Sequence, residues 1–191
     1  MSTQAAARSL DGIALPAPGV WEIDPSHSSV GAVARHLMVS KVRGRFTSFA
    51  GRVTIGESPE GSAVEATIEA ASIDTAEPKR DAHLRSPDFL DAERYPTLDF
   101  RSTAVKQTGP TSLSVDGDLT IRGITRPVTL EVGYGGLISD PFGNAKAIFS
   151  AQTEIDREDW GMTWNAALET GGVLVGKRLQ IELEIQAVRK P

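Results

Sequence analysis

The 191-residue sequence contains no cysteine and no long apolar run, and its basic residues are dispersed. The absence of cysteine excludes disulfides, thiol nucleophiles and zinc–thiolate sites. No stretch approaches the roughly 20 apolar residues of a transmembrane helix, so we expect no membrane span. A net charge of −5 with scattered lysine and arginine differs from the concentrated positive charge of a nucleic-acid-binding protein. We therefore expect no nucleic-acid partner.

The N-terminal residues 1–18 lack the apolar core of a secretory signal. Arg8 and Asp11 interrupt the segment, and no continuous apolar run precedes Pro16, whereas a signal needs about 7–15 apolar residues. We interpret residues 1–18 as a flexible arm and expect a cytoplasmic protein, although export by another route stays open. Residues 19–191 contain no linker or repeat and are predicted to form one domain, because all-β barrels often reach this length undivided.

Apolar and polar residues alternate with a period of two over much of the chain. The clearest case is the last predicted strand, in which Leu179, Ile181, Leu183 and Ile185 alternate with polar residues. The same pattern recurs in several segments between residues 63 and 134. This period is typical of strands with one buried face.

Long antiparallel strands with one apolar face must bury that face in a sandwich or a closed barrel. Gly44 and Gly51 interrupt strand patterns, and glycines at such positions suggest the bulges or bends by which a sheet curls. We therefore predict an all-β fold, an antiparallel barrel of about eight strands. Its interior would be wide enough for side chains or one slender ligand.

One segment interrupts the strand pattern. Residues 79–94 are predicted to form a short helical insertion, with Ser86 as N-cap and Pro87 at the first helical position. Pro96 then forces the preceding Tyr95 out of the helical conformation and into the next strand. A helix in an otherwise all-β chain is expected to plug, cap or flank the sheet.

The sequence carries no recognisable catalytic signature. His27, His36 and His83 do not have the short spacing of common metal-ligand motifs. No serine lies in a nucleophile elbow, and no glycine-rich loop has phosphate-binding form. Each histidine is better interpreted as a hydrogen-bonded residue at the end of a strand or helix. We expect no catalytic residue, no metal site and no cofactor.

Two further groups of residues allow two interpretations each. Lys41, Arg43 and Arg45 share one strand face, which fits a solvated outer face better than a cationic rim around an anionic head group. Trp160 and Trp164 are close in sequence and form either a core cluster or an apolar wall for a ligand tail.

Several stretches in the expected order carry a family pattern: WEIDPSHSSV at 21–30, RHLMVSKVRGRFTSFAG at 35–51, RDAHLRSPDFLDAERYPTLDF at 80–100, VDGDLTIRGITRPVTLEV at 115–132, EIDREDWGM at 154–162 and VGKRLQIELEIQA at 175–187. With these stretches the chain resembles the YceI-like family over nearly everything after residue 19. The resemblance implies an extended lipocalin-like antiparallel barrel with a helix. It also implies that the barrel interior binds a long polyisoprenoid or another amphipathic lipid-like molecule, without established catalysis.

The resemblance also guides the choice of candidate residues. It places the helical segment beside the barrel mouth, with Phe89 and Leu90 packed on the sheet. Ala32 stands where the family leads us to expect a large aromatic residue, so the cavity is widened there or another side chain fills the space. The predicted ligand contacts are His36, Arg43, Phe46, His83, Arg85, Phe89, Phe100, Trp160 and Trp164.

Three functional hypotheses follow from these observations. The leading one is non-enzymatic binding or carriage of a long-chain isoprenoid or similar amphipathic lipid in the barrel interior. The alternatives are a metal-assisted enzyme that uses the histidines and a stress-related structural or interaction protein with a filled barrel. A solvent-facing edge strand could also support a homodimer through continued strand pairing.

Overall fold

A computed structural model describes residues 9–10, 12–37, 39–169 and 171–189 of the chain. Its strands are β1 (Ser9–Leu10), β2 (Ile13–Ala14), β3 (Gly19–Ile23), β4 (Ser29–His36), β5 (Ser40–Phe46), β6 (Phe49–Ile55), β7 (Ala63–Glu69), β8 (Ile73–Asp74), β9 (Thr97–Gln107), β10 (Ser112–Ile121), β11 (Ile124–Ser139), β12 (Ala145–Asp156) and β13 (Val175–Arg189). Its helices are α1 (Pro78–Arg85) and the short 3-10 helices η1 (Pro59–Gly61), η2 (Ala70–Ser72) and η3 (Arg157–Trp160).

The main sheet closes on itself and forms a barrel. Around the ring the order is β12, β11, β10, β9, β7, β6, β3 and β13, and a further pairing of β13 with β12 completes the circle. Every pairing in this ring is antiparallel. The predicted all-β fold and the antiparallel barrel of about eight strands are therefore confirmed.

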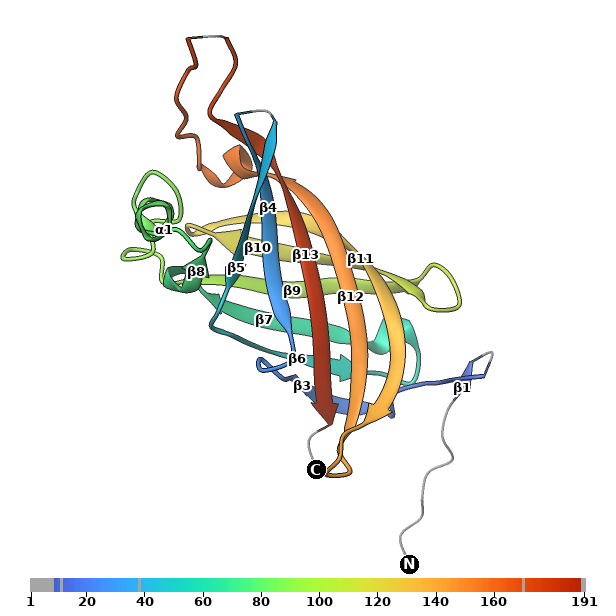
Figure 1. Cartoon of the computed structure of the whole chain (residues 1–191). Coiled ribbons are helices and arrows are strands. Elements are labelled where there is room, and N and C mark those ends of the chain that lie inside the picture. Colours follow the sequence, from blue (N-terminus) through green and yellow to red (C-terminus); the bar gives the residue numbers. More distant parts are fainter. Residues whose placement is uncertain (1–8, 11, 38, 170, 190–191) are drawn as a thin grey trace, which may run out of the picture.

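A second group of strands extends the barrel at the end that carries α1 (Figure 1). One edge of β13 pairs first with β4 and then, near its C-terminal end, with β3. The sheet continues from β4 to β5 and from β5 to β8, which leads into α1. These strands give the barrel a wall that reaches beyond the closed ring and ends beside the helix.

The period-two pattern of the sequence corresponds to an inside and an outside of this barrel. On β13 the side chains of Leu179, Ile181, Leu183 and Ile185 all line interior cavities. Lys177, Arg178 and Glu184 are exposed on the same strand. The predicted buried face of the last strand is therefore confirmed.

The predicted helical insertion is present but shorter than expected, and its caps are reversed. Glu77 is the N-cap of α1, because its carboxylate accepts the backbone N–H groups of Lys79 and Arg80. Ser86, predicted as an N-cap, is the C-cap. Pro87 explains the difference, since a residue before proline is pushed out of the helical conformation, and Ser86 has an extended ψ of 168°.

Gly44 and Gly51 are not bulges, because the strand register continues through both positions without a shift. Gly51 is needed for close packing instead: a Cβ there would lie 2.6 Å from the Glu65 carbonyl oxygen and 2.8 Å from Cδ1 of Ile23. Register shifts occur at other places, between Asp116 and Gly117 and between Tyr134 and Gly136. The sheet is therefore irregular at positions where the alternation of apolar and polar residues did not predict a bulge.

The described part of the predicted arm, residues 9–10 and 12–18, contacts the barrel. Ile13 and Leu15 pack against a buried cluster that includes Trp21 and Tyr134. The Tyr134 hydroxyl donates a hydrogen bond to the Ala14 carbonyl oxygen at 2.6 Å, and burial raises the pKa of Tyr134 to about 12. Within the described residues, no helix is long and apolar enough to cross a membrane.

We predict that Leu90→Asp destabilises the whole barrel. Leu90 is 8 % exposed in the core cluster beneath the helix end, so the substitution creates a cavity and buries a carboxylate. We expect a loss of about 3 kcal/mol or more in the free energy of unfolding, measured by urea denaturation. As a control, Val39→Asp at an 85 % exposed position should change stability by less than about 0.5 kcal/mol. Equal effects at the two positions would contradict this assignment.

Candidate ligand-binding site

An apolar cavity of about 420 Å³ opens at the barrel end next to α1, and we call it the helix-end cavity. Its volume falls in the range of about 300–1,000 Å³ that is usual for small-molecule sites. Its apolar lining comes from strands that are far apart in sequence: Ala32, Ala34, Val42, Phe46, Ile73, Leu98, Ile121, Ile155, Leu179 and Ile181. Because the barrel turns these side chains inward, the cavity can accept an apolar chain.

The lining near α1 is polar and mostly cationic. Arg35, Lys79 and Arg80 contribute to it, and Glu77 is the one carboxylate among the lining residues that the structure describes. Both oxygens of Glu77 already accept backbone N–H groups of α1, at 3.2 and 2.6 Å. The Arg80 guanidinium donates to the side chain and carbonyl oxygen of Thr75. This rim therefore presents an excess of positive charge beside an apolar interior.

An aromatic cluster stands between the rim and the interior. The His83 ring packs edge-on against Phe89 and Trp164, with centroid distances of 5.0 and 4.6 Å. Nε2 of His83 lies 2.8 Å from a carboxylate oxygen of Asp88, which holds the imidazole in place. All three rings line the helix-end cavity.

Arg157 lies within the cavity lining although it is only 1 % exposed. Its guanidinium donates hydrogen bonds to the carbonyl oxygens of Met162, Gly176 and Val175. Burial lowers the pKa of the Arg157 guanidinium, partly opposed by the charges of Glu158 and Asp156. The Arg157 side chain thus connects the segment after η3 to the start of β13 and places a cation in the cavity lining.

The structure brings together five of the nine predicted contacts. His36, Phe46, His83, Phe89 and Trp164 all line the helix-end cavity, although they come from β4, β5, the α1 region and the segment after η3. Ala32 also lines this cavity, as expected for a small residue that widens it. Whether these side chains contact a ligand stays a prediction.

The other four predicted contacts lie elsewhere. Arg43 is on the outer face of β5 and pairs with Glu182 at 2.9 Å, in agreement with the solvated-face interpretation. Arg85 donates to the carbonyl oxygens of Ala71 and Ile73 and so fastens α1 to β8. Trp160 is 2 % exposed in the core, and its indole N–H donates a hydrogen bond to the Leu119 carbonyl oxygen. Phe100 is also buried in the core, and it is not among the lining residues of the helix-end cavity.

Sequence reasoning missed several lining residues. Lys79 and Arg80 are not among the predicted contacts although they belong to the helical segment, and neither is Arg35, which lies beside the predicted His36. Their positions next to predicted contacts could have identified them. Arg157 gave no signal, because a buried guanidinium bound to carbonyl oxygens leaves no local pattern in sequence.

The three histidines do not gather at one site. His27 pairs with Asp24 at 2.7 Å, and the buried Lys146 donates to the same carboxylate at 3.0 Å. The Lys146 hydrogen bond, with smaller contributions from His27 and Ser26, lowers the pKa of Asp24 despite partial burial. In the part of the chain that the structure describes, no group of three His, Cys, Asp or Glu residues could hold a metal ion.

A closed antiparallel barrel with an apolar cavity, a helix at one end and an extended wall defines a lipocalin-like barrel protein. The model of the YceI-like domain matches residues 21–187, and the chain belongs to this family. Protein YceI of Escherichia coli O157:H7 is 39 % identical over 152 residues, which are 79 % of each chain.

Solved structures agree with this assignment at the level of the fold. BcnA of Burkholderia cenocepacia superimposes with a TM-score of 0.75 at 24 % identity, covering 86 % of this chain and 98 % of BcnA. A polyisoprenoid binding domain from Saccharophagus degradans, implicated in plant cell wall breakdown, has a TM-score of 0.69 at 12 % identity. The superposition covers 89 % of this chain and 98 % of that domain.

We predict that Asp24→Asn loses more stability at neutral than at acidic pH. A carboxyl group whose folded-state pKa is lowered stabilises the fold above its unfolded pKa, near 3.8, and this contribution disappears as the pH falls through the folded-state value. The variant should therefore be less stable than the wild type at pH 7, by about 1.5–3 kcal/mol for charged hydrogen bonds.

The difference should shrink below about pH 4, as measured by urea unfolding at several pH values. Asp118→Asn, at an exposed carboxylate of β10, serves as the control and should change the free energy of unfolding by less than about 0.5 kcal/mol. A constant difference between Asp24→Asn and the wild type at all pH values would contradict the assigned role of Asp24.

Proposed function

We propose that this protein binds or carries a long-chain isoprenoid or a similar amphipathic lipid, without catalysing a reaction. The observation that carries the proposal is the helix-end cavity, an apolar space inside a closed barrel with a cationic rim. Membership of the YceI-like family supports it, as does the fold shared with a polyisoprenoid binding domain.

The apolar lining supplies the affinity in this proposal. Each CH₂ group transferred from water into such a cavity contributes about 0.8 kcal/mol. Ala32, Ala34 and Gly44 line the cavity from β4 and β5, and their small or absent side chains leave space inside it. A flexible hydrocarbon chain fits such a lining because it needs no matching hydrogen bonds.

The cationic rim supplies a preference for the head group. Lys79, Arg80 and His83 contribute to the lining from α1, and Arg35 contributes from β4. A phosphate or another anionic head placed there would receive charge-assisted hydrogen bonds while the tail remains in the barrel. We therefore propose that anionic amphiphiles bind more tightly than neutral chains of equal length at this end.

The two alternative functions have less support. A metal-assisted enzyme would need its histidines together, whereas His27 pairs with Asp24 and Lys146, away from the cavity that His36 and His83 line. A barrel filled by its own side chains would leave no ligand space, which is at odds with the helix-end cavity of about 420 Å³.

We predict that Ala32→Trp weakens the binding of farnesyl phosphate by about tenfold or more. The indole would occupy the cavity, and a tenfold loss corresponds to about 1.4 kcal/mol, or roughly two buried CH₂ groups. Equilibrium dialysis with labelled farnesyl phosphate measures the effect, and mass spectrometry of a lipid extract tests for a resident ligand. The matched control is Ala50→Trp on the exposed side of β6, which should bind normally. Unchanged binding by Ala32→Trp, or none by the wild type, would contradict the proposal.

A second prediction concerns the head group. Lys79→Ala should weaken farnesyl phosphate binding about two- to fivefold at low salt, because exposed ion pairs contribute about 0.2–1 kcal/mol, and should leave farnesol binding unchanged. Lys41→Ala removes the same charge from β5 at an exposed residue that does not line the cavity, so both ligands should bind as before. Equal losses for the alcohol and the phosphate in Lys79→Ala would show that Lys79 does not recognise the head group.

A further inference from the structure

Two turns project together beside the helix-end cavity, and we call their described residues, 35–37 with 39–41 and 166–169 with 171–174, the paired tips. The first turn joins β4 to β5, and the second precedes β13. The Leu37 backbone N–H donates a hydrogen bond to the Leu174 carbonyl oxygen at 2.9 Å, which holds the two turns side by side. Figure 1 shows them at the top of the view, beyond the ring of strands. Arg35, His36 and Leu174 also belong to the cavity lining, so the paired tips adjoin the cavity.

The paired tips expose apolar side chains that do not contribute to the core. Six large apolar side chains are exposed among the described residues, and Leu37, Val39 and Val173 of the paired tips are three of them. None of these three belongs to a hydrophobic cluster of the described residues, and Val39 is 85 % exposed. Leu37 also has a φ of 53°, in the left-handed region that leucine rarely adopts. Folding therefore gives no reason for an apolar residue at this turn, where glycine would cost less.

Two cations stand beside these apolar side chains without a counter-charge. Arg35 on β4 and Lys41 on β5 are exposed and are direct partners in the strand register. No carboxylate in the described part of the chain forms an ion pair with either. Like charges directly opposite each other on neighbouring strands are destabilising, so an anionic surface outside the protein would relieve this repulsion. Glu169 is the one acidic residue of the paired tips, and their charge stays positive.

Projecting apolar side chains with adjacent cations fit the surface of a lipid bilayer that contains anionic lipids. Apolar residues enter the boundary between head groups and acyl chains, while lysine and arginine are attracted to the negative surface. A stable protein–protein interface instead buries about 800 Å² on each partner. The paired tips are two turns with three exposed apolar side chains, which suits insertion into a bilayer better than contact with a broad protein surface.

The opposite end of β13 lacks this combination. The β11–β12 turn lies beside the C-terminal end of β13, whereas the paired tips lie beside its start. Phe142 in this turn is 89 % exposed, but Asp140 is the one charged residue of 140–144. Lys146, just after the turn, is buried and pairs with Asp24. The β11–β12 turn therefore offers an equally exposed apolar side chain without available positive charge, and it serves as a matched control.

We propose that the paired tips dock this protein on an anionic lipid bilayer, with Leu37, Val39 and Val173 in the head-group region and Arg35 and Lys41 against lipid phosphates. Docking in this orientation places the helix-end cavity next to the bilayer, from which an amphipathic ligand can enter the barrel. The docking surface rests on the paired tips alone, whereas this transfer of a ligand rests on the proposed function.

Co-sedimentation with vesicles tests the docking. We expect the wild type to bind vesicles of equal parts phosphatidylglycerol and phosphatidylcholine, and to bind pure phosphatidylcholine vesicles at least about tenfold more weakly because two cations contribute. Val39→Ser should weaken binding to the anionic vesicles about fivefold or more, since an apolar side chain no longer leaves water. Phe142→Ser should bind as the wild type does. No binding by the wild type would overturn the proposal and favour a protein as the partner, and an equal loss in Phe142→Ser would also overturn it.

Removal of one charge tests the electrostatic part. Lys41→Ala should weaken binding to the anionic vesicles about fivefold, the contribution of one lysine near such a surface, and high salt should abolish the difference from the wild type. Lys106→Ala removes the same charge from a lysine that pairs with Asp116 at 3.3 Å and should change binding less than about twofold. Equal losses in the two variants would overturn the assigned role of the paired tips.

Ligand binding in solution separates docking from the proposed function. Val39→Ser and Lys41→Ala should bind farnesyl phosphate as the wild type does, because neither residue belongs to the described lining of the helix-end cavity. Vesicle binding without farnesyl phosphate binding would therefore contradict the proposed function while supporting the docking surface. Farnesyl phosphate binding without vesicle binding would overturn the docking surface alone.

A fluorescent label reports which part of the protein enters the bilayer. Because the chain contains no cysteine, Val39→Cys and Phe142→Cys each provide a single attachment site for the environment-sensitive dye NBD. We expect the emission of NBD on Val39→Cys to shift to shorter wavelength when the anionic vesicles are added, and that on Phe142→Cys to stay unchanged. Equal shifts at both positions, or a shift at position 142 alone, would overturn docking through the paired tips.

Discussion

The pairing of β12 with β13, which runs from Lys146 and Val188 to Asp156 and Arg178, closes the barrel. Without this ladder the sheet would end in two open edges, and its apolar face would have no interior to line. Closure also determines the ligand site, because Ile155 on β12 and Leu179 on β13 lie opposite each other in this ladder and both line the helix-end cavity. The cavity is therefore a consequence of one strand pairing across the chain.

The size of a few side chains decides where the barrel interior is open. Ala32 pairs with Gly44 across β4 and β5, and both residues line the helix-end cavity, which leaves space there. Phe100, in contrast, belongs to a packed cluster of apolar side chains that Leu183 joins. In a close-packed protein interior, such differences of one aromatic ring separate an open space from a filled one.

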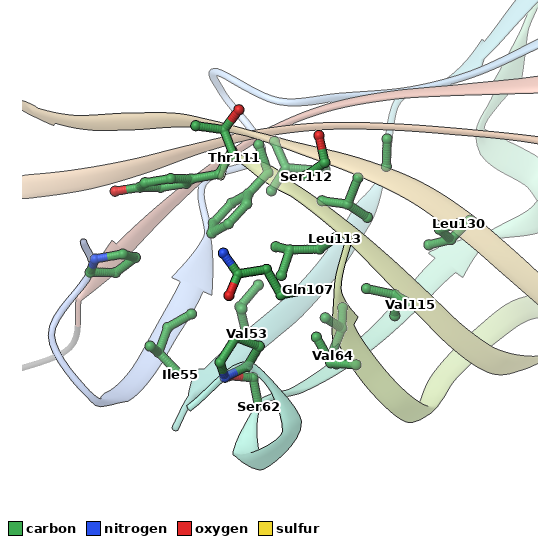
Figure 2. A pocket seen from close by; sticks show the side chains of 18 of the residues that line it. Val53, Ile55, Ser62, Val64, Gln107, Thr111, Ser112, Leu113, Val115 and Leu130 are labelled. Atoms are coloured by element: carbon green, nitrogen blue, oxygen red, sulfur yellow. The ribbon is translucent and has the colours of Figure 1, made fainter. Parts of the chain in front are cut away.

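The two ends of the barrel differ in charge as well as in shape. Arg35, Lys79, Arg80 and Arg157 contribute to the lining of the helix-end cavity. A second cavity of about 290 Å³, lined by Val53, Val64 and Leu113 among others, has no charged side chain among its described lining residues (Figure 2). At an opening of lower dielectric than water, these cations favour an anionic group over a neutral one. A protein whose net charge is −5 thus concentrates positive charge beside one opening, which gives an amphipathic ligand a preferred orientation.

The sequence by itself determined the all-β class, the inward face of β13 and the presence of a helical insertion, because alternation and proline placement are local properties of the chain. It also indicated His36, His83 and Trp164 as candidate contacts, and all three line the helix-end cavity. It did not determine that α1 ends at Arg85, since Ser86 and Pro87 are compatible with a start as well as an end.

Only the tertiary structure decided that Arg43 faces outward against Glu182 and that Phe46 and Leu179 line the same cavity. Both outcomes depend on which residues from distant strands meet across the barrel, and that information appears only when the ring closes.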